Sequence, residues 1–238
     1  MNDKKFQNYY YKYLEYKKMD SIIRSINREK KINNFYYPII VSKINDTMIY
    51  SITPKYFKEV KKGLQKGNIK DLEEVKKKFE LFFKANGISI EIQTMLRMSK
   101  NIENFDMDIS NVTEIKEKNK FEYFNSFNKI VDMEYKNSKW EKFKDYQYLN
   151  GIIKDNKFVS VGFVSNIDYN GANIVIQTKK EYQNRGYGKI IVEKISRDLL
   201  KDNIIPIYWV NVENIESNML AKSLGFEEQA VELIVKVI

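Results

Sequence analysis

The sequence predicts a mixed α+β fold arranged in two domains. Helical and strand-like periodicities alternate along the 238 residues, and the strand-like runs of the second half follow one another through short polar turns, which is typical of an antiparallel sheet. Hydrophobic residues make up 43% of the chain, enough to bury a sizeable core. Because the chain turns polar around residues 104–120, we expect a smaller α/β domain over 1–104 and a second domain over 105–238.

The composition excludes several kinds of chemistry. The chain has no cysteine and no histidine, which removes disulfides, thiolate nucleophiles, serine–histidine triads and most zinc sites, so no metal is expected. The net charge is +9, but acids intersperse the lysines, as in "DLEEVKKKFELFFK", which favours a solvated surface over a nucleic-acid-binding face. No apolar run approaches the roughly 20 residues that span a bilayer. The polar N-terminus is no signal peptide. We therefore expect a cytoplasmic protein without a membrane partner.

The first domain should begin with a helix and a hairpin. Residues 4–31 carry aromatic residues and then isoleucines at helical spacing, which predicts one long helix. The stretch "YYPIIVSKINDTMIYSI" has two β-branched runs around Asn45 and Asp46, which predicts a β-hairpin.

Two further helices and one ambiguous segment should complete the first domain. Thr53 and Pro54 supply an N-cap and a first-turn proline for a helix that runs to about Lys66. Asp71 should cap a strongly amphipathic helix that Gly87 ends. The following "ISIEIQTMLRMSK" fits either a strand or a helix.

The second domain should begin with helices and continue as a meander. Phenylalanines at helical spacing predict a helix over residues 121–131, with a shorter one near Trp140. After Gly151 the period changes to two, and "GIIKDNKFVSVGFVSNIDYNGANIVIQT" reads as three strands joined by turns at 155–156 and 169–171.

The last part of the chain should alternate helix and strand. A helix with Ile191, Ile195 and Leu199 on one face follows the meander. "IIPIYWVNV" predicts a strand, residues 214–223 a short helix that Gly225 ends, and "AVELIVKVI" a final strand.

A glycine-containing loop lies between a predicted strand and a predicted helix. In "KKEYQNRGYGK", Gly186 and Gly188 allow unusual backbone angles, and the first turn of the helix offers unpaired N–H groups and a positive dipole end. Such a loop suits a pyrophosphate, although two glycines can also merely shape a tight turn. No Gly-Lys-Ser/Thr follows and the third glycine of a dinucleotide fingerprint is missing, so neither of those motifs applies.

A second motif follows one strand later. "VNVENIESNMLAKSLGFEE" has the pattern N-x-x-S-x-x-L-A-x-x-L-G-F from Asn214 to Phe226. With Q-N-R-G-Y-G-K at 183–189, it resembles the acetyl-coenzyme A loop and the following helix of the GCN5-related N-acetyltransferases, the GNAT superfamily. The segments "IVIQT" and "PIYW" narrow the resemblance to the branch of the zwittermicin A resistance acetyltransferases. The resemblance covers roughly residues 105–238.

The resemblance implies a fold, a reaction and a set of contacts. The second domain would hold a central, mostly antiparallel sheet that splays at the coenzyme strand, and the first domain would close over the acceptor cleft. The reaction would be direct attack by a primary amine of a small molecule on acetyl-CoA, in a ternary complex. The implied coenzyme contacts are Ile176, Gln177, Thr178, Gln183, Asn184, Arg185, Gly186, Tyr187, Gly188, Lys189, Asn214 and Ser217.

The chain departs from the family at two catalytic positions. Ala221 stands where many relatives carry a tyrosine that acts as general acid, and Asn173 stands near the position of a glutamate in closer relatives. An asparagine cannot accept a proton at neutral pH. Ser217 is then a candidate to protonate or orient the leaving thiolate.

The general base is open at this level. It would act through water, with Asn173 at the family position, or be Glu213, Tyr208 or Asp106, each of which also suits a structural role. Asn214 equally suits a helix N-cap.

Two rival functions follow from the same residues. Asn173 and Ala221 also suit a degenerate module that binds coenzyme A with little or no catalysis. The positive charge and the aromatic N-terminus suit, less well, a basic protein that interacts with nucleic acid. The sequence leaves open whether the chain forms a homo-oligomer.

Overall fold

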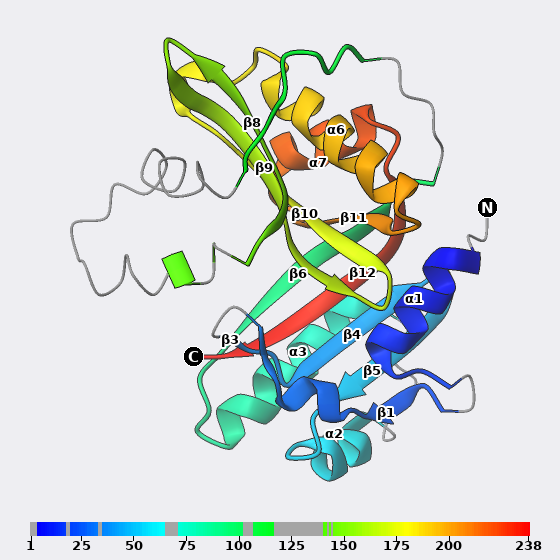
Figure 1. Cartoon of the computed structure of the whole chain (residues 1–238). Helices are drawn as coiled ribbons and strands as arrows, with labels where there is room; N and C mark the ends of the chain where they lie inside the picture. The colour runs from blue at the N-terminus through cyan, green and yellow to red at the C-terminus, as the bar shows by residue number, and fades with distance from the viewer. Residues whose placement is uncertain are drawn as a thin grey trace. The chain divides into compact units, whose positions relative to one another are not determined.

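The computed structural model describes residues 4–17, 20–32, 35–64, 71–101, 107–116, 140–141, 143 and 145–238 (Figure 1). Its helices are α1 (Lys4–Leu14), α2 (Phe57–Leu64), α3 (Leu72–Ala85), α6 (Tyr187–Lys201) and α7 (Ile215–Ser223). Its strands are β1 (Ile22–Arg24), β2 (Lys31–Ile32), β3 (Phe35–Tyr36), β4 (Ile39–Ile44), β5 (Thr47–Ile52), β6 (Ile90–Ser99), β7 (Thr113–Glu114), β8 (Gln147–Lys154), β9 (Lys157–Asp168), β10 (Gly171–Thr178), β11 (Ile205–Asn211) and β12 (Glu227–Val237).

The fold class is mixed α+β, as the sequence predicts. A ten-stranded, mostly antiparallel sheet has the order β1-β5-β4-β12-β6-β11-β10-β9-β8-β7, and β2 pairs with β3 in a separate ribbon. The helix expected over 121–131 lies outside the described residues. Of the shorter one near Trp140, only Trp140, Glu141 and Phe143 are described as helical. None of the helices in the described part of the chain is long and apolar enough to cross a membrane.

The chain divides into two compact units that interleave along the sequence. The first unit contains Met1–Met98, Trp209–Ile215 and Glu228–Ile238, and the second contains Ser99–Tyr208 and Glu216–Glu227. The C-terminal strand thus folds with the first hundred residues, and the predicted coenzyme loop lies in the second unit.

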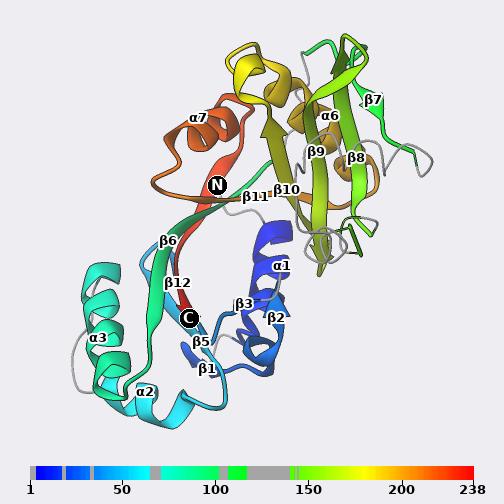
Figure 2. The same ribbon diagram turned by 90° about the vertical axis from the view of Figure 1, so that its left-hand side faces the viewer.

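The first unit is a sheet with helices on both faces. Successive side chains of a strand point to opposite faces, so Val41 and Leu233, which are paired in the β4–β12 ladder, share one face with the buried residues of α2 and α3. The neighbouring pair Ser42 and Glu232 faces the other way, toward Tyr10 of α1. Figure 2 shows α1 and α3 on opposite sides of these strands.

The predicted N-cap of α3 is present. The carboxylate of Asp71 accepts a hydrogen bond from the backbone N–H of Glu74 at 2.8 Å. We expect Asp71→Ala to lower the free energy of unfolding by about 1 kcal/mol, since an N–H of the first turn loses its acceptor. Asp71→Asn should retain most of the stability, because asparagine caps equally well. Urea denaturation measures both, and an equal loss in the two variants would contradict the cap assignment.

The predicted helix over residues 4–31 is wrong beyond its first half. Glu15 adopts a left-handed φ of 58° and α1 ends at Leu14. Residues 22–24 instead form β1, parallel to β5, and the N–H of Ser25 donates to Ile52 O at 2.7 Å. The β-branched Ile22 and Ile23 suit a strand. Their partner is β5, which comes later in the sequence, so a local pattern could not predict the pairing.

The other elements of the first unit match the predicted ones, except that α2 does not begin at Thr53 and Pro54. The hairpin of β4 and β5 turns at Asn45, which has a left-handed φ of 51°, as predicted. The ambiguous segment after Gly87 is the strand β6. The helix expected from Thr53 begins at Phe57, after a turn in which the N–H of Tyr56 donates to Thr53 O.

The second unit contains the predicted meander with α6 on one face. The turn residues Asp155, Asn156, Tyr169 and Asn170 all have left-handed φ values between 49° and 68°, which matches the twist of two-residue hairpin turns. The buried residues of α6 include the predicted Ile191, Ile195 and Leu199. Figure 1 shows α6 lying across β8, β9 and β10.

Candidate functional site

Strands β10 and β11 separate partway along β10. They pair in parallel at Gly171↔Ile205, Ala172↔Pro206 and Asn173↔Ile207, and a β-bulge follows between Asn173 and Ile174. Beyond this point the strand pairs described for β10 are with β9 alone, and they continue to Thr178. We call this separation the fork. An unpaired strand edge can bind an extended ligand through main-chain hydrogen bonds.

The loop after β10 ends at the N-terminus of α6. Gly186 is the N-cap of α6, with a left-handed φ of 78°, and Asn184 also has a left-handed φ, of 59°. Alternation between left-handed and ordinary backbone angles turns successive N–H groups into one concavity, which binds anions. Gly186 offers no side-chain cap to the first helical turn of α6, and helix N-termini of this kind bind anions through their backbone N–H groups.

The two glycines of the loop have different physical roles. A Cβ at Gly186 would meet no atom within 4 Å, so glycine is favoured at this position by its left-handed backbone and not by lack of space. A Cβ at Gly188 would lie 3.3 Å from Leu220, 3.4 Å from Ile176 and 3.6 Å from Thr178. Gly188 therefore lets the first turn of α6 approach β10 and α7 closely.

Two polar side chains of the loop brace its backbone. The Arg185 guanidinium donates to Glu181 O at 3.1 Å and lies 5.2 Å from the ring centre of Tyr182. The Gln183 amide donates to Thr178 O at 3.4 Å. Arg185 and Gln183 are both exposed, so their polar groups remain accessible from solvent beside the predicted anion site.

Ser217 lies on α7 within hydrogen-bond distance of a buried tyrosine. The hydroxyl oxygens of Ser217 and Tyr208 are 3.2 Å apart. Tyr208 is 4% exposed, and its burial raises the pKa of its hydroxyl above the ordinary value. The sequence proposed Tyr208 only as a base. A buried phenol with a raised pKa keeps its proton at neutral pH and is therefore a donor rather than a base.

Asn214 immediately precedes α7 but belongs to the first unit, whereas Ser217 belongs to the second. The turn before α7 is closed by Asn211, whose side chain accepts from the N–H of Glu213 at 2.8 Å and whose carbonyl accepts from the N–H of Asn214 at 3.0 Å. The sequence analysis did not predict the role of Asn211, although an asparagine whose side chain can accept from the N–H two residues later is a recognisable turn signal.

Asn173 lies at the vertex of the fork. Its side-chain N–H donates to the Ser165 hydroxyl at 3.1 Å, and its buried carbonyl oxygen has no hydrogen-bond partner among the described residues. Ala221, at the family position of the general acid, is fully buried. Of the carboxylates considered as bases, Glu213 is exposed and Asp106 lies outside the described residues.

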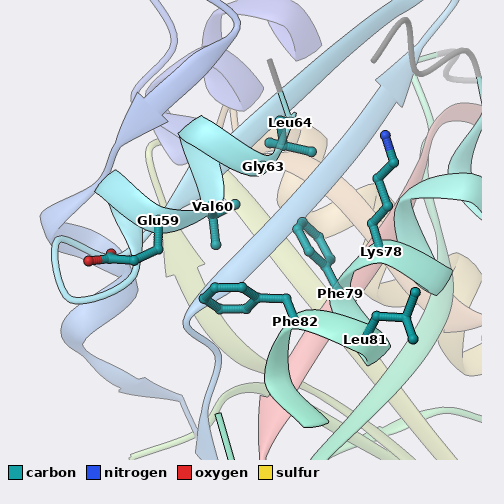
Figure 3. Close-up of a pocket in the computed structure, with 8 residues that line it drawn as sticks. All are labelled: Glu59, Val60, Gly63, Leu64, Lys78, Phe79, Leu81 and Phe82. Carbon is teal, nitrogen blue, oxygen red and sulfur yellow. The ribbon is translucent and has the colours of Figure 1, made fainter. Parts of the chain in front are cut away.

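A separate apolar pocket of about 340 Å³ lies in the first unit between α2 and α3 (Figure 3). Its lining residues are Glu59, Val60, Gly63, Leu64, Lys78, Phe79, Leu81 and Phe82. The carboxylate of Glu59 points away from the aromatic rings (Figure 3).

Comparisons with known proteins support the same family. The sequence model of the GNAT acetyltransferase family matches residues 15–231. No curated protein sequence matches the chain.

Solved structures share the fold. A Drosophila protein is 15% identical, with a TM-score of 0.54, over 88% of this chain and 77% of its own. A GNAT-family acetyltransferase from Colwellia psychrerythraea is 10% identical, with a TM-score of 0.52, over 88% and 84% of the two chains. A GCN5-related N-acetyltransferase from Sphaerobacter thermophilus is 6% identical, with a TM-score of 0.53, over 84% and 76%. The zwittermicin A resistance branch stays a prediction, but the match along nearly the whole sequence places the chain itself in the GNAT acetyltransferase family.

Proposed function

We propose that this protein is an acetyl-CoA-dependent N-acetyltransferase that acts on a primary amine of a small molecule. The observation that carries the proposal is the fork, in which β10 loses its β11 partner after Asn173 and is then followed by the glycine loop at the N-terminus of α6. One strand thus offers an extended ligand a hydrogen-bonding edge at one end and a pyrophosphate site at the other.

The residues of the second unit suit the coenzyme along its length. The main chain of Ile176, Gln177 and Thr178 would pair with the pantetheine arm as an added strand. The loop from Gln183 to Lys189, including Tyr187 and Gly188, would hold the pyrophosphate through backbone N–H groups. Lys179 and Lys180 add positive charge near the same loop. Ser217 would contact the far side of the coenzyme.

The chemistry requires both substrates to be held together. An amine nitrogen attacks the thioester carbon directly, and much of the rate then comes from proximity and orientation. Backbone N–H groups near Ile176 would stabilise the developing oxyanion. The carbonyl oxygen of Asn173, which has no partner in the part of the chain that the structure describes, would accept a hydrogen bond from the amine and orient it. The amine proton would leave through water, since Asn173 cannot take it.

Binding is tested by a thermal-shift titration of the purified protein with acetyl-CoA. A ligand of the native state at about 100 times its dissociation constant adds roughly 2.7 kcal/mol. For a chain of this size we expect a saturable rise of about 5 to 10 °C in Tm. The absence of any shift for the folded protein would refute the coenzyme site and the proposed function.

Turnover is tested by release of free thiol from acetyl-CoA with a panel of amino sugars, polyamines, amino acids and amine-bearing antibiotics. Acetylation of one of them supports the enzyme. The resemblance to the zwittermicin branch favours an antibiotic-like or metabolite amine. Tight coenzyme binding without any transfer would instead favour a non-catalytic coenzyme A-binding module, for which Asn173 and the buried Ala221 are the motivation.

A further inference from the structure

Tyr208 occupies a special place on β11. Ile207 is the last residue of β11 that pairs with β10, so Tyr208 is the first residue beyond the vertex of the fork. Its ring packs edge-on against Phe226 with 5.6 Å between the ring centres, and its hydroxyl lies 3.2 Å from Ser217 Oγ. The buried Tyr208 thus places its hydroxyl within hydrogen-bond distance of a serine, which allows it to orient that serine.

Either hydroxyl can donate in this contact, so its direction is part of the assignment. Removal from water raises the pKa of Tyr208, so its hydroxyl stays protonated throughout the neutral range. A phenol is a stronger donor than an alcohol, and we assign Tyr208 as the donor and Ser217 Oγ as the acceptor. The Ser217 hydroxyl hydrogen then points away from Tyr208, and the chain of two hydrogen bonds strengthens it as a donor.

We infer that Tyr208 is a positioning residue, which holds the Ser217 hydroxyl as the hydrogen-bond donor to the sulfur of the leaving coenzyme A thiolate. The inference rests on the proposed function. With the pyrophosphate at the N-terminus of α6 and the pantetheine along Ile176–Thr178, the sulfur end of the coenzyme runs toward the vertex, where Tyr208 begins the separated part of β11.

The atoms balance without a proton from either hydroxyl. The C–N bond forms, the C–S bond breaks, and sulfur takes the electron pair of the broken bond. The proton of the attacking amine goes to water. Ser217 keeps its proton and stabilises the thiolate by hydrogen bonding, which replaces the acid that relatives carry at the position of Ala221.

The test measures the pKa of the coenzyme A thiol in the bound state, which needs no knowledge of the acceptor. The protein is saturated with free coenzyme A, and thiolate absorbance is followed between pH 6 and 10 against protein alone. An ordinary thiol has a pKa of about 8.5. We expect a pKa about one unit lower in the wild type, because a hydrogen bond to the charged form favours it. In Tyr208→Phe and in Ser217→Ala the thiol pKa should return toward the ordinary value.

A matched variant separates this effect from the general loss of a tyrosine hydroxyl. Tyr148 in the same unit donates to Asp202 at 2.6 Å, on a different part of the meander. Tyr148→Phe should leave the thiol pKa of bound coenzyme A lowered, as in the wild type. Coenzyme affinity and Tm are recorded for each variant. Ser217→Ala keeps the test decisive if Tyr208→Phe does not fold, because the effect of Tyr208 passes through that hydroxyl.

The outcomes separate the role of Tyr208 from the proposed function of the protein. Coenzyme binding with the same thiol pKa in the wild type and both fork variants overturns the role of Tyr208 and Ser217, and leaves the proposed function standing. A wild type that does not bind coenzyme A overturns the proposed function and this inference with it. A pKa lowered in the wild type and in Tyr148→Phe alone supports the inference.

Discussion

Replacement of Arg97 by methionine is expected to lower the free energy of unfolding by about 3 to 5 kcal/mol, because it leaves a buried carboxylate without its counter-charge. In the first unit the guanidinium of Arg97 donates to both oxygens of Glu232, at 2.7 and 3.2 Å, and to the Tyr9 hydroxyl at 2.9 Å. Arg97 is 4% exposed and Glu232 is fully buried. Urea denaturation gives the loss directly.

The surroundings of the pair explain why the loss should be large. Tyr10 and the indole N–H of Trp209 also donate to Glu232, and the Arg97 guanidinium lies 4.4 Å from the ring centre of Tyr13. Burial, and then the charge of Glu232, raise the pKa of Tyr10 well above its ordinary value, so Tyr10 remains a donor. Without Arg97, these neutral donors alone cannot offset the free-energy cost of removing the Glu232 carboxylate from water.

A double variant and a surface pair serve as controls. Arg97→Met combined with Glu232→Gln should recover much of the loss, because glutamine carries no charge, its side-chain oxygen can still accept from Trp209, and the Tyr10 hydroxyl can donate to Ser42 instead. Lys61→Met breaks a half-exposed ion pair with Asp20 and should cost no more than about 1 kcal/mol. A loss for Arg97→Met as small as that for Lys61→Met would show that the buried pair does not stabilise the fold.

The second large effect is expected at the coenzyme loop. Gly186→Val should weaken acetyl-CoA binding by at least about tenfold, because a left-handed backbone costs an L-residue roughly 1–2 kcal/mol and β-branched residues adopt it with difficulty. The loop would relax to another conformation, and its N–H groups would no longer converge. Isothermal titration with acetyl-CoA measures the change.

Asparagine is the matched control at this position. Asparagine tolerates left-handed angles, as Asn184 does in the same loop with a φ of 59°. Gly186→Asn should therefore bind acetyl-CoA within about threefold of the wild type. Equal binding by the valine and asparagine variants would mean that the loop is only a turn, which is the simpler interpretation that its sequence allows.

The candidate site was largely visible in the sequence because its signals are local. The glycine loop, the start of α6 and the motif from Asn214 to Phe226 depend on residues a few positions apart. The hydrogen bond between Tyr208 and Ser217 was not visible, since it joins a strand to a helix whose relative orientation no periodicity encodes. The turn closed by Asn211 was missed although its signal was local.

The sequence by itself determined the amphipathic helices, the left-handed turns of the meander and the glycine loop, because backbone sterics and side-chain period act over a few residues. Tertiary structure decided the rest. It paired residues 22–24 as a strand beside β5 and placed most of β12 in the first unit. It also paired Arg97 with Glu232, 135 residues away in the sequence. It also ended the β10–β11 pairing at Asn173. Such non-local contacts follow from burial and hydrogen-bond satisfaction summed over the whole chain, which no local pattern records.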